Sequence, residues 1–444
     1  MSGPPVTARQ RLTRSYGWIA MLLIAFGIGL YIPLQVLGPL RMLHGNDFKH
    51  IYLGMQALTE GTEPYSAESL LLQASLHGLR GASLNPYVYL PFTGLAMAFL
   101  KPFGFAVASW IWFALNHVMV LAAAFVMSAA LLPDYLERAQ WRAHLFGALL
   151  VALALDFPLH RTLTAGQLNC VLLLCLALAH HSLVGGRDGR AGAVLGFAAV
   201  FKLAPGLFVL HFALRRRWRA LAAMCATGAV LLLASVAAVG VRIHLAFLPM
   251  LRQMGYGRST WEEHGATFWK DPPNQSLNSL LTHLLASGNG LTDPWIELEQ
   301  RHADALTVAA TLALVAAFVL VAWWRSRADG ASACVEAAPG AAAREQALFM
   351  ATVMLMLLIP SLMWDHYLLM AILPAAWLAT DALRRGRRAT AVVAVLLFAA
   401  TAVRWDFASP AHTGGPGILL MSVKLFPALG IFAMCLRAAL PRAR

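Results

Sequence analysis

The chain alternates between long apolar runs that contain no charged residue and short segments rich in arginine. The uncharged runs cover residues 15–40, 102–133, 162–186, 220–241, 305–324 and 346–364. Each run is close to or longer than the roughly 20 residues that an α-helix needs to cross the hydrocarbon core of a bilayer, which is roughly 30 Å thick. The pattern predicts an all-α polytopic membrane protein, organised as a single integral membrane domain over residues 1–444.

Composition supports this interpretation. Hydrophobic residues make up 59% of the chain and charged residues 12%, about half the charged fraction of a typical soluble domain. The net charge of +13 comes from 34 Lys and Arg against 21 Asp and Glu. Such an excess is typical of proteins whose basic loops face anionic membrane lipids, and here it indicates the cell inner (plasma) membrane. A soluble enzyme, a secreted disulfide-rich domain and a partner in nucleic acid are excluded.

The basic segments predict which loops face the cytoplasm. Arginines 9, 11 and 14 precede the first apolar run, and further clusters lie at 215–219, 325–327 and 384–388. Positively charged loops stay on the cytoplasmic side. Segment 41–84 therefore becomes the first extracytoplasmic loop, and segment 242–303 a large extracytoplasmic loop. Residues 326–345, rich in Ala with Gly and Pro, are predicted to form a flexible cytoplasmic loop.

The stretch 85–214 allows two arrangements. Its apolar segments lie near 85–100, 105–132, 143–160, 168–184 and 191–214. Five crossings give about 12 transmembrane helices in total (about 11–13), but they place four arginines outside, against the positive-inside rule: Arg138, Arg142, Arg187 and Arg190. The alternative breaks the last segment at 202–205 and makes one other segment re-entrant, because interrupted helices are tolerated where they line a cavity.

Charged side chains beside the apolar runs are the first candidates for function, because a charge inside a bilayer costs at least about 2.5–3.5 kcal/mol. Asp47 follows the first predicted helix at the external face, and Lys49 and His50 come shortly after Asp47, beyond Phe48. A carboxylate among basic groups suits a general base beside an anion site. A helix N-cap or a solvated loop carboxylate explains the same pattern, and spacing alone leaves these interpretations open.

Three basic residues are candidates for binding a phosphate group. Lys202 lies within an apolar segment just before Pro205, where a helix break would present a buried cation to an anion. His366 lies at an external junction between two predicted helices, where it could hold a phosphate or pass a proton. Arg161 opens a polar cluster before another helix. A snorkelling lysine and an interfacial histidine are the alternatives.

Amide, aromatic and acidic side chains at the same predicted face suit contacts with sugar hydroxyls. These candidates are Tyr65, Tyr87, Gln167, Asn169, Asn274, Gln275, Trp364 and Asp365. Turn residues, helix caps and an interfacial aromatic belt are typical of the same positions. The sequence contains no metal-ligand cluster, phosphate-binding loop or nucleophile elbow, so no metal and no cofactor are expected.

Taken in order, these motifs resemble glycosyltransferase family 87, which includes polyprenol-phosphate-mannose-dependent mannosyltransferases. The resemblance covers residues 40–370 and rests on Asn46-Asp47-Phe48, Gly61-Thr62-Glu63-Pro64-Tyr65, Asn85-Pro86-Tyr87, Gly166-Gln167-Leu168-Asn169, Phe201-Lys202-Leu203-Ala204-Pro205, Asn274-Gln275-Ser276-Leu277 and Trp364-Asp365-His366. A Tyr-Pro-Pro type sequence is common in the family where this chain has Asn85-Pro86-Tyr87. That departure concerns the entrance to the second helix.

The resemblance implies a GT-C glycosyltransferase fold with a pocket at the external membrane face. It implies that a hexose, with mannose favoured, passes from a polyprenyl phosphate to a lipid or glycan acceptor. Glucose and the pentose arabinose are the open alternatives. An aspartate in the first external loop acts as general base in such enzymes, and this role carries over to Asp47. The acceptor oxygen would attack C1 and displace the lipid phosphate with inversion, with Lys202, His366 and Arg161 at the phosphate.

A second class of function stays open, namely a polytopic transporter or flippase of lipid-linked sugars or other amphiphiles. Such proteins are built from inverted repeats and carry polar residues near the membrane midplane on several helices. The sequence shows no obvious repeat, and most of its polar motifs lie at the predicted external edge. Both observations favour the enzyme.

Overall fold

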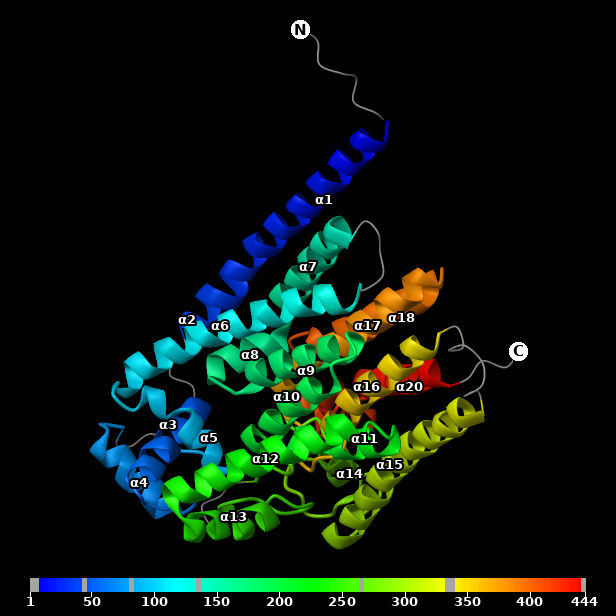
Figure 1. Ribbon diagram of the computed structural model, residues 1–444. Helices are drawn as coiled ribbons and strands as arrows, with labels where there is room; N and C mark the ends of the chain where they lie inside the picture. Colours follow the sequence, from blue (N-terminus) through cyan, green and yellow to red (C-terminus); the bar gives the residue numbers. More distant parts are fainter. Residues whose placement is uncertain are drawn as a thin grey trace.

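The computed structural model describes residues 8–41, 46–79, 84–132, 138–262, 267–331 and 340–440. Within these residues the structure is helical and contains no β-strand (Figure 1). The predicted all-α class is therefore confirmed. Every residue of α16 (Ala341–Leu358) from Ala347 onward is buried. This helix is the centre of the core and contacts α9, α11, α15, α17 and α20.

The α-helices have the following bounds: α1 Ala8–Tyr31, α2 Gly38–Leu40, α3 Asn46–Thr59, α4 Ala67–Leu76, α5 Pro91–Ala96, α6 Phe105–Ala130, α7 Arg138–Leu155, α8 Phe157–Ala165, α9 Asn169–Val184, α10 Asp188–Phe201, α11 Phe208–Leu214, α12 Trp218–Val239, α13 Val241–Gln253, α14 Leu277–Leu285, α15 Gln300–Ala331, α16 Ala341–Leu358, α17 Ile372–Arg384, α18 Arg388–Ala402, α19 Ile418–Met421 and α20 Leu425–Ala439. A π-helix, Ile32–Leu37, joins α1 to α2. The 3₁₀ helices are Ala98–Leu100, Ala204–Leu207, Asp365–Ala371, Pro410–His412 and Gly415–Gly417.

Several of these helices are long and apolar enough to cross a membrane. There are six in the described residues, or up to eight if each of two bent helix pairs is one span. Three shorter apolar helices lie beside them: Asn169–Val184, Ala204–Leu214 and Arg388–Ala402. The helices identify a multi-pass membrane protein, but the predicted count of about 12 spans is not confirmed.

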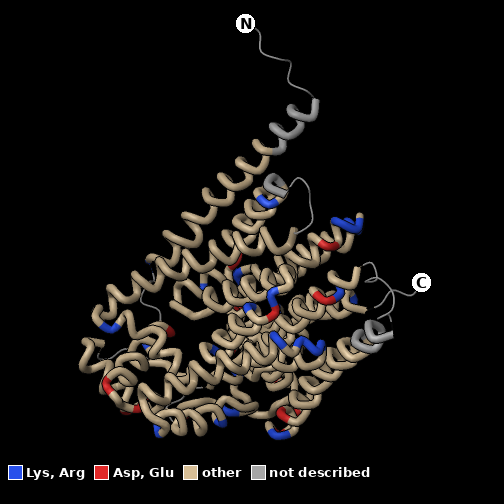
Figure 2. Tube along the Cα trace, in the orientation of Figure 1, with Lys and Arg blue, Asp and Glu red and all other residues tan. Residues whose placement is uncertain are grey.

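The basic loops meet at one end of the helix bundle. The guanidinium of Arg217, directly before α12, lies 2.6 Å from the Asp188 carboxylate at the start of α10 and 2.9 Å from Glu345 near the start of α16. Arg215 lies 2.7 Å from the same glutamate. Figure 2 shows basic segments at this end, where α11 meets α12 and where α17 meets α18. This end, which contains the loops before α10, α12 and α18, is the basic end.

The arginines of the disputed stretch also lie at the basic end. Helices α10 and α12 run parallel in close contact. They approach so closely that a β-carbon at Gly192 or Gly196 would collide with the carbonyl of Ala220 or Met224. The charges of Arg142, Arg187 and Arg190 all act on His181 at the end of α9. The five-crossing arrangement, which places Arg138, Arg142, Arg187 and Arg190 outside, is not confirmed. If the basic end faces the cytoplasm, the positions of these arginines favour the alternative with fewer crossings.

Two local features explain why the segments 85–100 and 191–214 do not each form one full transmembrane helix. The segment near 85–100 contains only the six-residue helix α5 and a short 3₁₀ turn, too short to cross a bilayer. The segment 191–214 breaks at Lys202, which has an extended backbone (φ −153°, ψ 122°). Pro205 has no N–H to donate to the Phe201 carbonyl four residues earlier. The Thr93 hydroxyl donates to that carbonyl at 2.8 Å, so the break is stabilised from outside the helix.

The predicted loops contain helices of their own. Segment 41–84 forms α3 and α4, and segment 242–303 includes most of α13 and all of α14. Helix α15 extends to Ala331 and α16 begins at Ala341, so both ends of the predicted flexible loop 326–345 are helical. Residues 332–339 of that loop lie outside the described residues.

Sidedness gives a direct test of this arrangement. Gly104 and Gly189 each lie at the start of a helix, and a β-carbon at either meets no atom within 4 Å. In a chain whose native cysteines are replaced, we expect Gly104→Cys to react with an impermeant thiol reagent from outside and Gly189→Cys only after the cytoplasmic face is exposed. Labelling of intact cells measures this. Labelling of Gly189→Cys from outside would contradict the assignment of the basic end to the cytoplasm.

Candidate active site

A cavity of about 690 Å³ lies at the ends of the helices remote from the basic end. Its wall comes from the start of α3, from α8 and the turn before α9, from the break after α10, from the end of α16 and from the 3₁₀ helix Asp365–Ala371. Segments distant in sequence therefore meet here. The structure brings these predicted site residues to its lining: Asp47, His50, Arg161, Gln167, Lys202, Trp364 and His366.

The carboxylate of Asp47 is held by two side-chain amides. Asn85 donates from Nδ2 to Oδ1 at 2.7 Å, and Gln167 donates from Nε2 to Oδ2 at 2.8 Å. Asp47 is the second residue of α3, where the positive end of the helix dipole also favours a negative charge. Each oxygen keeps lone pairs free of these two bonds. The carboxylate is thus fixed in orientation and still able to accept a proton.

The protonation state of Asp47 follows from its surroundings. Burial alone would raise the pKa of this carboxyl, because a charged group loses its hydration. Electrostatic interactions with His50 and His366 and the hydrogen bonds from Gln167 and Asn85 outweigh burial and hold the pKa of Asp47 below its ordinary value. The group is therefore an ionised carboxylate at neutral pH.

The turn after α8 fixes the amide of Gln167. Gly166 ends the helix in the left-handed region (φ 68°), where a side chain would also collide with Phe48. The Gly166 carbonyl accepts a hydrogen bond from Trp112 Nε1 at 2.9 Å. The Tyr89 hydroxyl donates to Gln167 Oε1 at 3.3 Å. Because the oxygen faces Tyr89, the NH₂ group of Gln167 faces Asp47.

Lys202 enters the cavity from the helix break. Its Nζ donates to Asn169 Oδ1 at 3.2 Å and lies 3.7 Å from the centre of the Tyr367 ring. Helix α10 has 14 residues and is about 20 Å long, shorter than the roughly 30 Å hydrocarbon core. The break therefore places a lysine deeper than a lysine at the end of a full transmembrane helix would lie.

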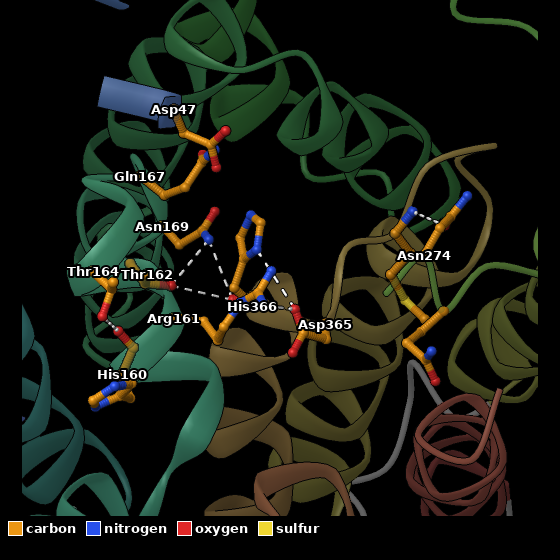
Figure 3. Close-up of polar contacts among 12 residues, drawn as sticks. Asp47, His160, Arg161, Thr162, Thr164, Gln167, Asn169, Asn274, Asp365 and His366 are labelled. Atoms are coloured by element: carbon orange, nitrogen blue, oxygen red, sulfur yellow. Dashed lines mark hydrogen bonds and ion pairs between the residues drawn. The ribbon is translucent and has the colours of Figure 1, made fainter. Parts of the chain in front are cut away.

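Arg161 and His366 share one buried carboxylate (Figure 3). Oδ1 of Asp365 lies 3.6 Å from Nε of Arg161 and 3.7 Å from Nδ1 of His366. Asp365 is 0% exposed and lies behind the lining, whereas Arg161 and His366 line the cavity. Asp365 was predicted to bind substrate, but its position makes it a support for two lining residues.

Asn169 was also predicted to bind substrate, and it too lies behind the lining. Its Nδ2 donates to the His366 carbonyl and to the Thr162 hydroxyl, both at 3.2 Å, while its Oδ1 accepts from Lys202. The side chain is 0% exposed. Asn169 therefore joins the lysine at the helix break to the segment that carries His366.

Other predicted residues lie outside the lining. Tyr65 is buried, and its hydroxyl donates to the Tyr89 carbonyl at 3.0 Å. Tyr87 is also buried and donates to the Leu90 carbonyl at 3.2 Å. Lys49 lies on α3, one residue before His50, and does not line the cavity. The two tyrosines shape the segment that carries Asn85 and Tyr89, and their position outside the lining does not support the predicted contact with substrate.

Asn274 and Gln275 bind backbone groups and do not line the cavity. Both are 0% exposed. Asn274 Nδ2 contacts the carbonyls of Phe268, Trp269 and Ser361, and its Oδ1 accepts from the Met363 N–H at 2.9 Å. These bonds use the whole amide to tie the loop after α13 to the segment before Asp365. The predicted sugar contact of this motif stays a prediction that its position outside the cavity lining does not support.

Several lining residues were not predicted. Asn85 and Tyr89 flank the Tyr87 that the sequence singled out, and Tyr367 follows His366. Asp271 is a second carboxyl group in the lining, and burial raises its pKa. These four residues lie within, or at most three positions from, the motifs quoted above, and this closeness was the available sequence signal. Sequence spacing alone does not distinguish which member of a short motif faces the cavity.

The cavity combines an ionised carboxylate, four basic side chains (His50, Arg161, Lys202 and His366) and a long apolar wall. Leu203, Leu207 and Leu357 belong to that wall. A proton acceptor beside cations can remove a proton from a hydroxyl group while the cations stabilise a departing anion. Among the described residues, no group of three or more His, Cys, Asp or Glu side chains could hold a metal ion.

A comparison with known families decides the class of this protein. The model of glycosyltransferase family 87 matches residues 87–343, more than half of the chain. The chain belongs to glycosyltransferase family 87. It is therefore a membrane glycosyltransferase, and the resemblance inferred from the sequence motifs is confirmed. No curated protein and no solved structure matches this family 87 chain.

Proposed function

We propose that this family 87 enzyme transfers a hexose from a polyprenyl phosphate to a lipid or glycan acceptor. Mannose is the favoured sugar, and glucose or the pentose arabinose is the alternative. The fold is of the GT-C type, and the reaction takes place at the extracytoplasmic face of the plasma membrane. The observation that carries the proposal is the position of Asp47. Its oriented carboxylate shares one cavity with Lys202, Arg161 and His366.

The transfer reaction needs a proton acceptor for the acceptor hydroxyl and cations for the leaving phosphate, and the cavity offers both. Asp47 accepts the proton of the acceptor hydroxyl as the oxygen attacks C1 of the sugar. The bond between C1 and the phosphate oxygen breaks, and its electron pair leaves with the polyprenyl phosphate. Attack from the face opposite the leaving group inverts the configuration at C1. Lys202, His366 and Arg161 stabilise the charge that develops on the leaving phosphate.

Two further features support a lipid-linked donor. The basic side chains lie beside the apolar residues Leu203, Leu207 and Leu357, so one cavity offers contacts for a phosphate and for the first part of an isoprenoid chain. The cavity lies at the end of the bundle remote from the basic loops. Because basic loops face the cytoplasm, the donor would meet the enzyme at the other face.

Transfer from a defined donor tests the proposed function. We expect the purified protein in nanodiscs to transfer labelled mannose from polyprenyl-phosphate mannose to a membrane lipid extract, and to give no product with a nucleotide-linked mannose. Polyprenyl-phosphate glucose and arabinose identify the sugar if mannose is inactive. A transporter or flippase would move the labelled donor across a sealed vesicle without forming a new glycoside. That outcome would refute the proposal.

A further inference from the structure

Lys424 is a fully buried cation beneath the cavity. It lies between α19 and α20 and is 0% exposed. Its Nζ lies 3.9 Å from Oδ2 of Asp365, and 5.3 Å and 5.6 Å from the ring centres of Phe157 and Phe407. Within the described residues this ammonium has no hydrogen-bond partner. A buried charge is costly unless opposite charge lies close, so its position depends on Asp365.

Gln275 fixes the backbone from which Lys424 extends. Its Oε1 accepts from the Lys424 N–H at 3.1 Å, and its Nε2 donates to the carbonyls of Met421 at 2.6 Å and Pro272 at 3.1 Å. The two helices on either side of this point meet at 64°. Gln275 therefore holds the bend that places the ammonium under the cavity, which explains why a glutamine of the loop after α13 is completely buried.

Asp365 connects Lys424 to the cavity lining. One carboxylate oxygen faces Lys424, and the other lies within 3.7 Å of both Arg161 and His366. Asp156, which caps the start of α8 through the Leu159 N–H, also interacts with the charge of Lys424. Helix α8 carries Arg161, and the 3₁₀ helix Asp365–Ala371 carries His366. One ammonium thus lies between the two elements that present these side chains.

We propose that Lys424 is a positioning residue for the donor-phosphate site: it holds the Asp365 carboxylate in the orientation that keeps Arg161 and His366 directed at the phosphate. The inference rests on the proposed function, because it takes these two residues as phosphate ligands. Lys424 itself does not line the cavity and does not touch the donor. Its effect passes through Asp365, since without Lys424 that carboxylate loses the cation on its far side and its orientation depends on Arg161 and His366 alone.

The test uses lipid-phosphate binding and transfer kinetics of the full-length protein in nanodiscs. We expect Lys424→Met to weaken the binding of polyprenyl phosphate and to lower kcat/KM for the donor by about 10–100-fold, because small displacements of positioning groups have effects of this size. Binding of uncharged polyprenol and the KM for the acceptor should stay unchanged. Lys424→Arg keeps the charge and should retain most of the activity.

A double variant separates positioning from stability. In an Asp365→Asn background, Lys424→Met should cause less than a roughly threefold further loss, because its effect is carried by the missing carboxylate. The double variant removes the charges of Asp365 and Lys424 together, so neither is left buried without the other. It therefore provides a folded reference if Lys424→Met alone is unstable. Asp188→Asn, which breaks an ion pair at the basic end, controls for destabilisation and should leave the donor KM unchanged.

The outcomes of the two proposals can be told apart. Losses that multiply in the double variant, or wild-type phosphate affinity and kcat/KM in Lys424→Met, would overturn the positioning role. Failure of the wild-type protein to bind polyprenyl phosphate or to use any polyprenyl-phosphate sugar would instead overturn the proposed function and, with it, the phosphate ligands on which this inference depends.

Discussion

Replacing Asp47 by Asn is expected to abolish sugar transfer while the protein still folds. An amide has nearly the shape of a carboxylate but does not accept a proton at neutral pH, so roughly 10²–10⁴-fold should be lost from base catalysis. The neighbouring amides set the structural cost. Asn85 can turn to offer its oxygen to the new NH₂ group, whereas the oxygen of Gln167 is already bonded to Tyr89. Turnover of labelled donor and thermal unfolding of the same preparation measure the two effects.

A matched control is available on the next helix. Glu68 is the second residue of α4, as Asp47 is of α3, and it is exposed to solvent. Glu68→Gln should transfer sugar like the wild type. Asp271 is the other carboxyl group in the cavity lining among the described residues. Near-normal turnover in Asp47→Asn, together with a large loss in Asp271→Asn, would move the base to Asp271.

The pH dependence of transfer gives a second measurement of the same base. Asp47 acts only when ionised, and its pKa lies below the ordinary value, so the acid limb of kcat/KM should lie at correspondingly low pH. Gln167→Leu keeps the base but removes one hydrogen bond to the ionised form. The pKa of Asp47 then rises, and the acid limb should move to higher pH. An acid limb that stays in place would indicate that another group is titrating.

The class of the fold and several site residues could be predicted because their signals are local. Uncharged runs of about 20 residues depend only on the thickness of the bilayer. Lys202 stood out because a lysine within an apolar segment needs a reason, and the break beside Pro205 supplies one. Asp47, next to histidine and at the start of a helix, stood out in the same way.

The course of the chain between 85 and 214 was harder to predict, because hydropathy does not show where an apolar segment turns back. The region near 85–100 is apolar because its helix α5 packs against α3, α10 and α12. It is too short to be apolar for the purpose of crossing a membrane. Its six-residue helix α5 carries Thr93, which supports the break at Lys202.

The roles of the amide residues could not be predicted from the sequence. An asparagine or glutamine beside a turn has the same local pattern whether it faces a sugar or a backbone carbonyl. Asn274 and Gln275 bind backbone at 0% exposure, while Gln167 faces the cavity. Lys424 was overlooked for a related reason. Its partner Asp365 is 59 positions away in the sequence (424 − 365 = 59), and only the folded chain brings them together.

Lys202→Met is expected to have the second largest effect on transfer. The substitution keeps a flexible unbranched side chain of similar length that can still pack against the Tyr367 ring, but it removes the charge. A cation at a developing negative charge is worth most in a cavity with few waters. We therefore expect about 10²–10³-fold lower kcat, by analogy with the loss of one charge-stabilising donor, and weaker binding of polyprenyl phosphate in nanodiscs.

Two comparisons make the Lys202 result specific. Lys101 is exposed and donates to the Thr59 carbonyl, and it does not line the cavity, so Lys101→Met should leave donor affinity and kcat unchanged. Lys202→Arg keeps the charge and should therefore retain part of the activity. The recovery should be incomplete, because a planar guanidinium replaces a compact ammonium that fits between Asn169 and Tyr367. If Lys202→Met binds polyprenyl phosphate and turns over donor like the wild type, the phosphate does not lie at the helix break. Arg161 and His366, which both lie close to Asp365, would then be the ligands to test next.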